Sequence, residues 1–324
     1  GAIANIIVDN ITPEENIGSY RAQYLSSLSG KILRLNPANG NGLPSNPFYD
    51  AANPRSPKSR IWAIGFRNPF RMTLMPNTGV TDITAGNPGL LAAGEVGWNS
   101  WEETNIITRG GNYGWPFYEG ITPAATFPLY FKYNYDAPNP LYGINGCTQQ
   151  YFYFQDLLKQ NSYNAATNAF KNPCDPQQLI PANIPVFYHQ PPAIDWKHEA
   201  NYARVPVFGI DTLLADTLGS PGNSVVGSPF PGNCSVTGTF YNDNRFPPAY
   251  QGTLFQADYG ALWIKSISFN NDNKVTAVNT FADSVGSIVF LTVRPQDGCL
   301  TYITLPNSLH KICYTANINN FPTA

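Results

Sequence analysis

The sequence is poor in charged residues and has no long apolar run. Lys, Arg, Asp and Glu make up 12% of the 324 residues, about half the usual share, and the formal net charge is −2. The longest apolar run, residues 288–293, is far shorter than the roughly 18 residues of a membrane span. We therefore expect no membrane span, and the near-neutral charge gives no reason to expect nucleic acid as a partner.

The motifs of many common chemistries are also absent. The sequence has no GxSxG elbow, HExxH, phosphate-binding glycine loop or EF-hand loop. Its first residues lack the basic and apolar regions of a signal peptide, so we expect none in this chain.

Few residues offer a general base or a metal site. The three histidines are His189, His198 and His310. Asp195, His198 and Glu199 could hold a metal ion, but their spacing fits no regular element that the sequence predicts. A polar loop is the simpler interpretation of that segment.

Five cysteines are present, and none has the CxxC spacing of a zinc site. Cys299 and Cys313 lie in neighbouring predicted strands and could form one disulfide. Cys147 and Cys174 flank a polar segment and could close it with another. Cys234 is then left over or pairs with something outside this chain.

Two sequons begin at Asn10 and Asn233 and permit N-glycosylation. Together with the low lysine content and the candidate disulfides, they favour an extracellular, secreted protein. The alternative is an intracellular protein whose buried cysteines stay reduced.

The 29 prolines and 27 glycines divide the sequence into short pieces. Most pieces have the composition of strands of about four to eight residues between turn signals. One helix is predicted over residues 151–170, around the sequence QDLLKQ. Strands are predicted at 253–259, 262–269, 274–281, 287–293 and 299–305, and they follow one another as antiparallel meanders.

Residues 61–108 repeat this rhythm of strand, turn and strand. Repeated meanders are typical of β-propeller blades, although a β-sandwich would give similar strand lengths. The irregular block 121–231 is predicted to be an insertion, of the kind that gathers on one face and builds or covers a binding site.

A series of motifs carries a specific resemblance. In chain order they are SLSGKILRLNP (27–37), NPFYD (46–50), WAIGFRNPFR (62–71), GEVGW (94–98) and GGNYGWP (110–116). This order and spacing resemble the glucose/sorbosone dehydrogenase family, which are soluble quinoprotein sugar dehydrogenases built as six-bladed propellers. The resemblance implies an all-β chain, residues 1–324, that forms one partial propeller domain lacking the first blades.

The resemblance also implies a cofactor site at Arg67 and Asn68. In the family the Arg-Asn pair contacts pyrroloquinoline quinone (PQQ) and the reacting sugar. A guanidinium can pair with a carboxylate of PQQ or stabilise negative charge on the quinone oxygen, and Pro69 fixes the turn behind the pair. Alternatively, Arg67 caps strand carbonyls inside the propeller.

A calcium site is implied at the main-chain carbonyls of Gly97 and Trp98, because the family holds Ca²⁺ against the quinone through such a pair. Calcium accepts carbonyl oxygens readily. Tryptophan is a departure at position 98, where the family commonly has proline. Glu103 and Asn105 are expected to orient this loop.

Other features of the family are missing. The family's catalytic histidine is expected to lie outside this chain, and Asp258 stands where a lysine is common. We therefore keep two main hypotheses. The chain is part of a PQQ-dependent sugar dehydrogenase, or it is a non-catalytic extracellular propeller that binds glycans or other extracellular proteins. A purely structural role in an extracellular matrix is the third.

Overall fold

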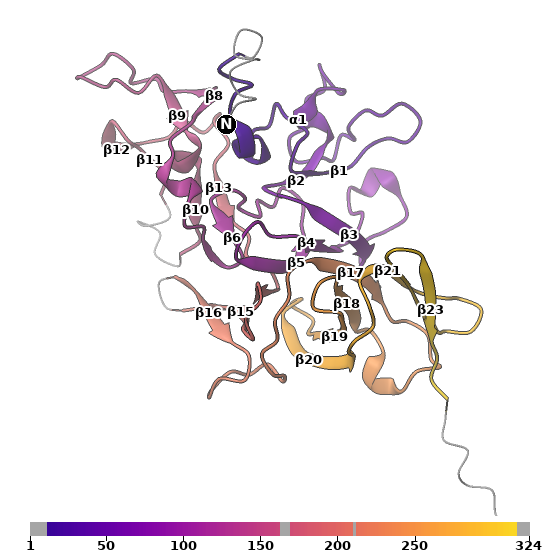
Figure 1. Ribbon diagram of the computed structural model, residues 1–324. Coiled ribbons are helices and arrows are strands. Elements are labelled where there is room, and N and C mark those ends of the chain that lie inside the picture. Colours follow the sequence, from indigo (N-terminus) through magenta and orange to yellow (C-terminus); the bar gives the residue numbers. More distant parts are fainter. Residues whose placement is uncertain (1–11, 163–168, 210–211, 316–324) are drawn as a thin grey trace, which may run out of the picture.

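The computed structural model describes residues 12–162, 169–209 and 212–315, and this part of the chain is built mostly of strands (Figure 1). The helical elements are short: α1 (Pro57–Arg60) and the 3₁₀ turns η2 (Gly18–Gln23), η3 (Ile83–Ala85), η4 (Phe127–Leu129), η5 (Phe154–Leu157) and η6 (Pro248–Tyr250). None of the described helices has the length and hydropathy needed to cross a bilayer.

Three larger sheets form the body of the molecule. The first has six strands, in the spatial order β16 (Leu213–Thr217), β15 (Ala203–Phe208), β14 (Ile194–Lys197), β5 (Trp101–Ile107), β4 (Leu91–Glu95) and β3 (Pro69–Leu74). The second contains β17 (Ser235–Phe240), β18 (Leu254–Asp258), β19 (Trp263–Phe269) and β20 (Val275–Ala282). The third contains β21 (Ile288–Val293), β22 (Leu300–Thr304) and β23 (Ser308–Ile312).

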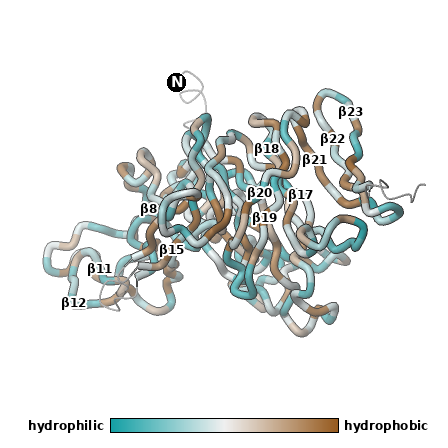
Figure 2. The backbone as a smooth tube through the Cα atoms, turned by 90° about the horizontal axis from the view of Figure 1, so that it is seen from below, coloured by the Kyte–Doolittle hydropathy of each residue, from teal (hydrophilic) through white to brown (hydrophobic). Residues whose placement is uncertain are grey.

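Smaller two-stranded units surround these sheets. They are β1 (Lys31–Leu33) with β2 (Ile61–Ile64), β6 (Tyr118–Glu119) with β7 (Thr122–Pro123), β8 (Tyr133–Pro138) with β9 (Tyr151–Tyr153), β10 (Leu158–Gln160) with β13 (Phe187–His189), and β11 (Lys171–Asn172) with β12 (Asp175–Leu179). Figure 2 shows β8, β11 and β12 at one end of the molecule, and β21, β22 and β23 at the other.

The predicted antiparallel meanders are confirmed as β18 to β22. The four-stranded sheet is buried on both faces, and the first five residues of β19 are accordingly all buried. Trp263 and Ile267 pack in a cluster shared with the six-stranded sheet, whereas Ile264 packs in a cluster shared with the third sheet. Sheets stacked face to face in this way resemble successive blades, but the described sheets do not close into a ring.

The predicted helix over residues 151–170 is wrong. The chain there forms β9, the single turn η5 and β10, and residues 163–168 lie outside the described part. Asp156 accepts a hydrogen bond from the main-chain N–H of Tyr153 and so fixes the turn. In the structure β9 pairs with β8 and β10 pairs with β13. The helix prediction considered only the composition around QDLLKQ and took no account of this pairing with distant strands.

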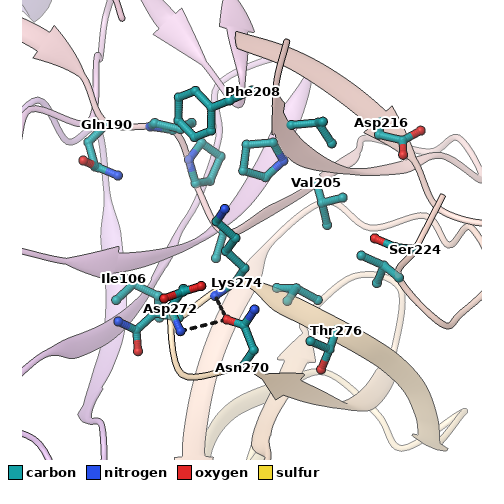
Figure 3. Close-up of a pocket in the computed structure, with 18 of the residues that line it drawn as sticks. Ile106, Gln190, Val205, Phe208, Asp216, Ser224, Asn270, Asp272, Lys274 and Thr276 are labelled. Carbon is teal, nitrogen blue, oxygen red and sulfur yellow. Dashed lines mark hydrogen bonds between the residues drawn. The ribbon is translucent and has the colours of Figure 1, made fainter. Parts of the chain in front are cut away.

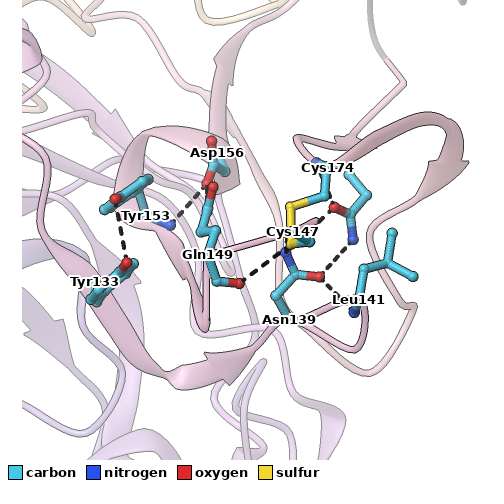
Figure 4. The surroundings of a disulfide bond; sticks show 9 residues. Tyr133, Asn139, Leu141, Cys147, Gln149, Tyr153, Asp156 and Cys174 are labelled. Atoms are coloured by element: carbon cyan, nitrogen blue, oxygen red, sulfur yellow. Dashed lines mark hydrogen bonds between the residues drawn. A yellow bond between two sulfur atoms is a disulfide. The ribbon is translucent and has the colours of Figure 1, made fainter. Parts of the chain in front are cut away.

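Both predicted disulfides are present. Cys147 joins Cys174 beside a reciprocal pair of amides, Asn139 and Asn172, which hydrogen-bond at 2.8 Å (Figure 4). Cys299 joins Cys313 at the edge of the third sheet. Cys234 has no disulfide partner among the described residues.

The block 121–231 has two parts. Residues 133–184 form β8 to β12 around a small apolar cluster of their own, made of Ala137, Phe152, Leu157, Phe170, Ile180 and Ile184. Residues 194–217 instead supply β14, β15 and β16, which extend the main sheet beyond β5. The strands β8 to β12 therefore lie outside the three larger sheets.

Candidate functional site

The turn that carries Arg67 and Asn68 is fixed by a carboxylate from the neighbouring sheet. The buried strand β2 leads into Gly65, whose φ of 84° and contact with Asn112 leave no room for a Cβ atom. Glu95, at the end of β4, then accepts hydrogen bonds through Oε1 from the main-chain N–H groups of both Arg67 and Asn68. The turn is thus held at a fixed position relative to β4.

Two buried carboxylates shape the loop between β4 and β5. Oε1 of Glu119 accepts hydrogen bonds from four consecutive main-chain N–H groups, those of Trp98 (2.9 Å), Asn99 (2.7 Å), Ser100 (2.8 Å) and Trp101 (3.3 Å). The N–H of Gly97 donates to Glu102 at 3.1 Å. A Cβ atom at Gly97 would lie 1.8 Å from the carbonyl oxygen of Trp101, so this position requires glycine.

The carbonyl oxygens of Gly97 and Trp98 accept no hydrogen bond from the described residues. An ion at these two oxygens would therefore displace no hydrogen bond from a described residue. Calcium accepts such uncharged oxygens, and the donor set therefore fits the ion that the sequence predicts here.

Arg67 and Trp98 line the same cavity, with a volume of about 510 Å³. The guanidinium of Arg67 donates to the carbonyl of Val96 at 2.9 Å and lies 5.9 Å from the ring of Trp115. Asn68 and Gly97 lie next to these residues in the chain but are not among those that line the cavity. The structure therefore brings two of the four predicted residues to one cavity.

Among the cavity residues that the sequence did not predict, Arg21, Trp115 and Phe127 carry a charge or an aromatic ring. Trp98, Trp115 and Phe127 form an aromatic triangle with ring centroids 5.2 to 6.3 Å apart. Arg21 and Trp115 both lie within segments that the sequence singles out, RAQYLSSLSGKILRLNP and GGNYGWP. Phe127 follows these motifs in the irregular block, and no sequence signal marks it.

Lys31 binds the main chain of residues that line this cavity. Its ammonium donates hydrogen bonds to the carbonyls of Arg21 (2.7 Å), Ala22 (2.9 Å) and Ser29 (2.8 Å), three residues that line the cavity. Burial lowers the pKa of Lys31 to about 7. Since all three N–H donors of the ammonium are used in these bonds, Lys31 stabilises the main chain around the cavity.

A row of charged side chains crosses the six-stranded sheet behind the site. Glu95, Glu103, Asp195 and Arg204 lie directly opposite one another on β4, β5, β14 and β15. Arg204 binds both carboxylate oxygens of Asp195, at 3.0 and 2.6 Å, and stacks on Trp101. Burial raises the pKa of Glu95 to about 8 and that of Glu103 well above its usual value, and the charge of neighbouring carboxylates adds to both rises.

The histidines have structural partners. His198 lies 2.6 Å from Glu102; burial opposes its protonation, but the hydrogen bond and charge of Glu102 outweigh that effect and raise its pKa. His189 is buried against Tyr118, and burial lowers its pKa to about 3. Neither histidine is among the residues that line the cavity of Arg67.

The metal site considered at Asp195, His198 and Glu199 does not form. Asp195 pairs with Arg204, and His198 pairs with Glu102. Across the described residues, the single group of three metal-binding side chains is Asp297, Cys299 and Cys313, and its two sulfur atoms are joined in a disulfide.

Comparison with known proteins agrees with the motifs. Residues 10–128 match the model of the Glucose / Sorbosone dehydrogenase family. Over 162 residues the chain is 33% identical to "HIPL2 protein" of Arabidopsis thaliana. That alignment covers 41% of this chain and 21% of the relative. Over 87 residues it is 38% identical to "Quinoprotein glucose dehydrogenase B" of Acinetobacter calcoaceticus, covering 27% and 15% of the two chains.

Among solved structures, a glucose dehydrogenase aligns with 93% of this chain and 59% of its own, at 21% identity and a TM-score of 0.49. The strand content of the described residues, rather than this alignment, identifies the fold as all-β. Residues 10–128 are thus similar to the glucose/sorbosone dehydrogenase family. Its aligned parts span 15 to 24% of the curated relatives' own length.

Proposed function

We propose that this chain carries part of the cofactor and substrate site of a PQQ-dependent sugar (aldose) dehydrogenase, in which a sugar hydroxyl is oxidised by hydride transfer to a calcium-bound quinone. The observation that supports this most directly is the cavity shared by Arg67 and Trp98. It joins the two motifs that the resemblance assigns to the cofactor and the metal ion.

The cavity suits a flat, anionic ligand. Arg21 and Arg67 supply two guanidiniums, and both are strong partners for carboxylates. Trp98, Trp115 and Phe127 supply apolar ring surface on which a planar quinone can lie. Arg21 thus adds a second positive charge to the cavity from a different part of the chain.

The roles of the chain's own groups follow from their contacts. A bound quinone would supply the acceptor for the hydride. The guanidinium of Arg67 would orient the anionic end of the ligand. Its position is fixed by the carbonyl of Val96 and by the hydrogen bond from the Arg67 main chain to Glu95. The open carbonyls of Gly97 and Trp98 would hold Ca²⁺, and the aromatic triangle would limit access of water. The group that accepts the proton of the sugar hydroxyl is predicted to be a histidine that lies outside this chain.

Tryptophan fluorescence can test this proposal, because Trp98 and Trp115 line the cavity. Titration of the longest available form of the protein with PQQ in the presence of Ca²⁺ should quench fluorescence saturably, and Arg67→Ala should weaken binding about 10-fold. Arg55→Ala, which removes an exposed arginine that contacts Asn39, is the control and should bind normally. Equal affinity of Arg67→Ala and the unaltered protein, or no saturable quenching, would refute the proposal.

A second candidate function is a non-catalytic extracellular protein that binds glycans or other proteins. It is favoured by the exposed apolar run Leu129, Tyr130 and Phe131, with exposed fractions of 73%, 61% and 63%. Such a run beside the cavity residue Phe127 is unusual for a surface without a partner. This alternative would be favoured by two results together. The unaltered protein should fail to bind PQQ, and both it and Arg67→Ala should bind a glycan or a protein.

Secretion and glycosylation are proposals that accompany both functions. The two disulfides support an oxidising environment. Asn233 is exposed at the surface, whereas Asn10 lies outside the described residues. A mass shift on treatment with peptide N-glycosidase, lost in Asn233→Gln, would assign the glycan; an unshifted mass would exclude it.

A further inference from the structure

A second cavity lies at the opposite end of the same strands. It has a volume of about 640 Å³ and opens between the end of β15 and the turn that joins β19 to β20; we call it the far groove (Figure 3). Strand β5 connects the two cavities. Trp101 follows the loop of the first cavity, and Ile106 lines the far groove five residues later, about 17 Å along an extended strand.

The floor of the far groove is apolar and its walls are polar. The floor consists of buried side chains from β5, β15, β20 and the segments that connect the strands: Ile106, Pro192, Val205, Val225 and Val275. Gln190, Asp216, Ser224, Lys274 and Thr276 line its walls, and their side chains make no hydrogen bond or ion pair with other described residues. Polar groups without protein partners around an apolar floor are typical of a small-molecule site.

The chemistry of the walls selects a class of ligand. Asp216 and Asp272 supply carboxylates and Lys274 supplies one ammonium, so the groove carries no excess of positive charge and is a poor site for a phosphate or a polycarboxylate. Gln190, Ser224 and Thr276 offer neutral donors and acceptors, which suit hydroxyl groups.

Phe208 completes the site. Its ring lies in the upper wall, near Gln190, across the groove from Lys274 (Figure 3). An exposed ring beside hydroxyl-binding groups suits a pyranose, which has an apolar C–H face and a polar edge. The volume lies within the roughly 300–1,000 Å³ of ligand pockets.

We propose that the far groove is a carbohydrate-binding site for a neutral saccharide, separate from the cavity of Arg67. A saccharide bound there would be held without reaction, since no residue of the far groove also lines the cavity of Arg67. This proposal does not depend on PQQ binding, because the two sites share no residue.

Calorimetric titration of the whole chain with maltotriose and with cellotriose tests the proposal. At least one should bind, and Asp216→Asn combined with Lys274→Met should weaken that binding at least 5-fold. Both substitutions are at partly or fully exposed positions, so the variant should keep its melting temperature; Lys132→Met, an exposed lysine elsewhere, should bind like the unaltered protein.

Two further variants separate this site from the first. Phe208→Ala should also weaken binding, whereas Arg67→Ala should leave it unchanged. The proposal is overturned if neither trisaccharide binds, if the double variant binds as well as the unaltered protein, or if Arg67→Ala or added PQQ abolishes the binding. That last result would place the sugar in the first cavity and leave the proposed function standing.

Discussion

Glu95 lies directly opposite Glu103 across strands β4 and β5, and both side chains are buried. Two carboxylates in such a position cannot both be ionised cheaply. Glu95 also holds the main-chain N–H groups of Arg67 and Asn68. The protonation of this pair and the geometry of the candidate cofactor turn are therefore linked.

Glu95→Gln should flatten the dependence of stability on pH. Burial raises the pKa of Glu95 from 4.5 to about 8, so the folded protein holds a proton that the unfolded chain releases. The associated stability is present below about pH 4.5 and is lost as pH rises through about 8, with an upper limit of about 5 kcal/mol. Glutamine keeps the carbonyl acceptor and does not ionise.

Urea unfolding at pH 5, 7 and 8.5 measures this effect. The unaltered protein should lose free energy of unfolding toward pH 8.5, and Glu95→Gln should lose less. Glu14→Gln, at an exposed site, should behave like the unaltered protein. An identical pH profile for Glu95→Gln would show that Glu95 is ionised in the folded state.

Glu119→Ala should loosen the loop of residues 98–101. Four main-chain N–H groups would lose one shared acceptor, and buried unpaired donors are costly, at about 1–3 kcal/mol each where water cannot replace the acceptor. Hydrogen exchange at these amides should accelerate, while β19 stays protected. Unchanged exchange in the loop would mean that other contacts hold it.

Arg21→Gln should weaken PQQ binding about 10-fold, through the loss of a charge-assisted contact. Arg21 and Arg67 line the same cavity from elements far apart in the chain. Arg245→Gln, on the surface beside Asp243, is the matched control. Fluorescence quenching gives both affinities, and equal values for the two variants would remove Arg21 from the site.

Cys147→Ser with Cys174→Ser should destabilise the part of the insertion between residues 133 and 184. The bond closes a loop with a sequence separation of 27, and losing it costs about 3 kcal/mol in a chain-entropy account. Because this segment has its own apolar cluster, limited proteolysis should cut it first. PQQ binding in the Arg67 cavity should persist; simultaneous loss of both would show that the segment and the cavity fold as one unit.

The sequence predicted features that depend on neighbours along the chain. Alternating apolar residues and turn signals located β18 to β22, and cysteine positions in adjacent strands or flanking one segment predicted both disulfides. The resemblance of the Arg-Asn-Pro turn and the GEVGW loop to family motifs predicted two residues of the cavity, Arg67 and Trp98.

The failed helix at 151–170 marks the limit of such reasoning. The composition of QDLLKQ is compatible with helix, and only pairing with β8 and β13 decides for strands. The same holds for the row from Glu95 to Arg204, where register across four strands brings the charges together.

The sequence by itself thus predicted the all-β class and two possible disulfides from local pattern and spacing, and its motifs carried the family resemblance. Tertiary structure alone decided that Arg21 joins Arg67, that the charges from Glu95 to Arg204 form one row across the sheet, and that a polar groove opens at the far end of the strands. Those relationships depend on the packing of sheets from distant segments, which local propensity does not encode.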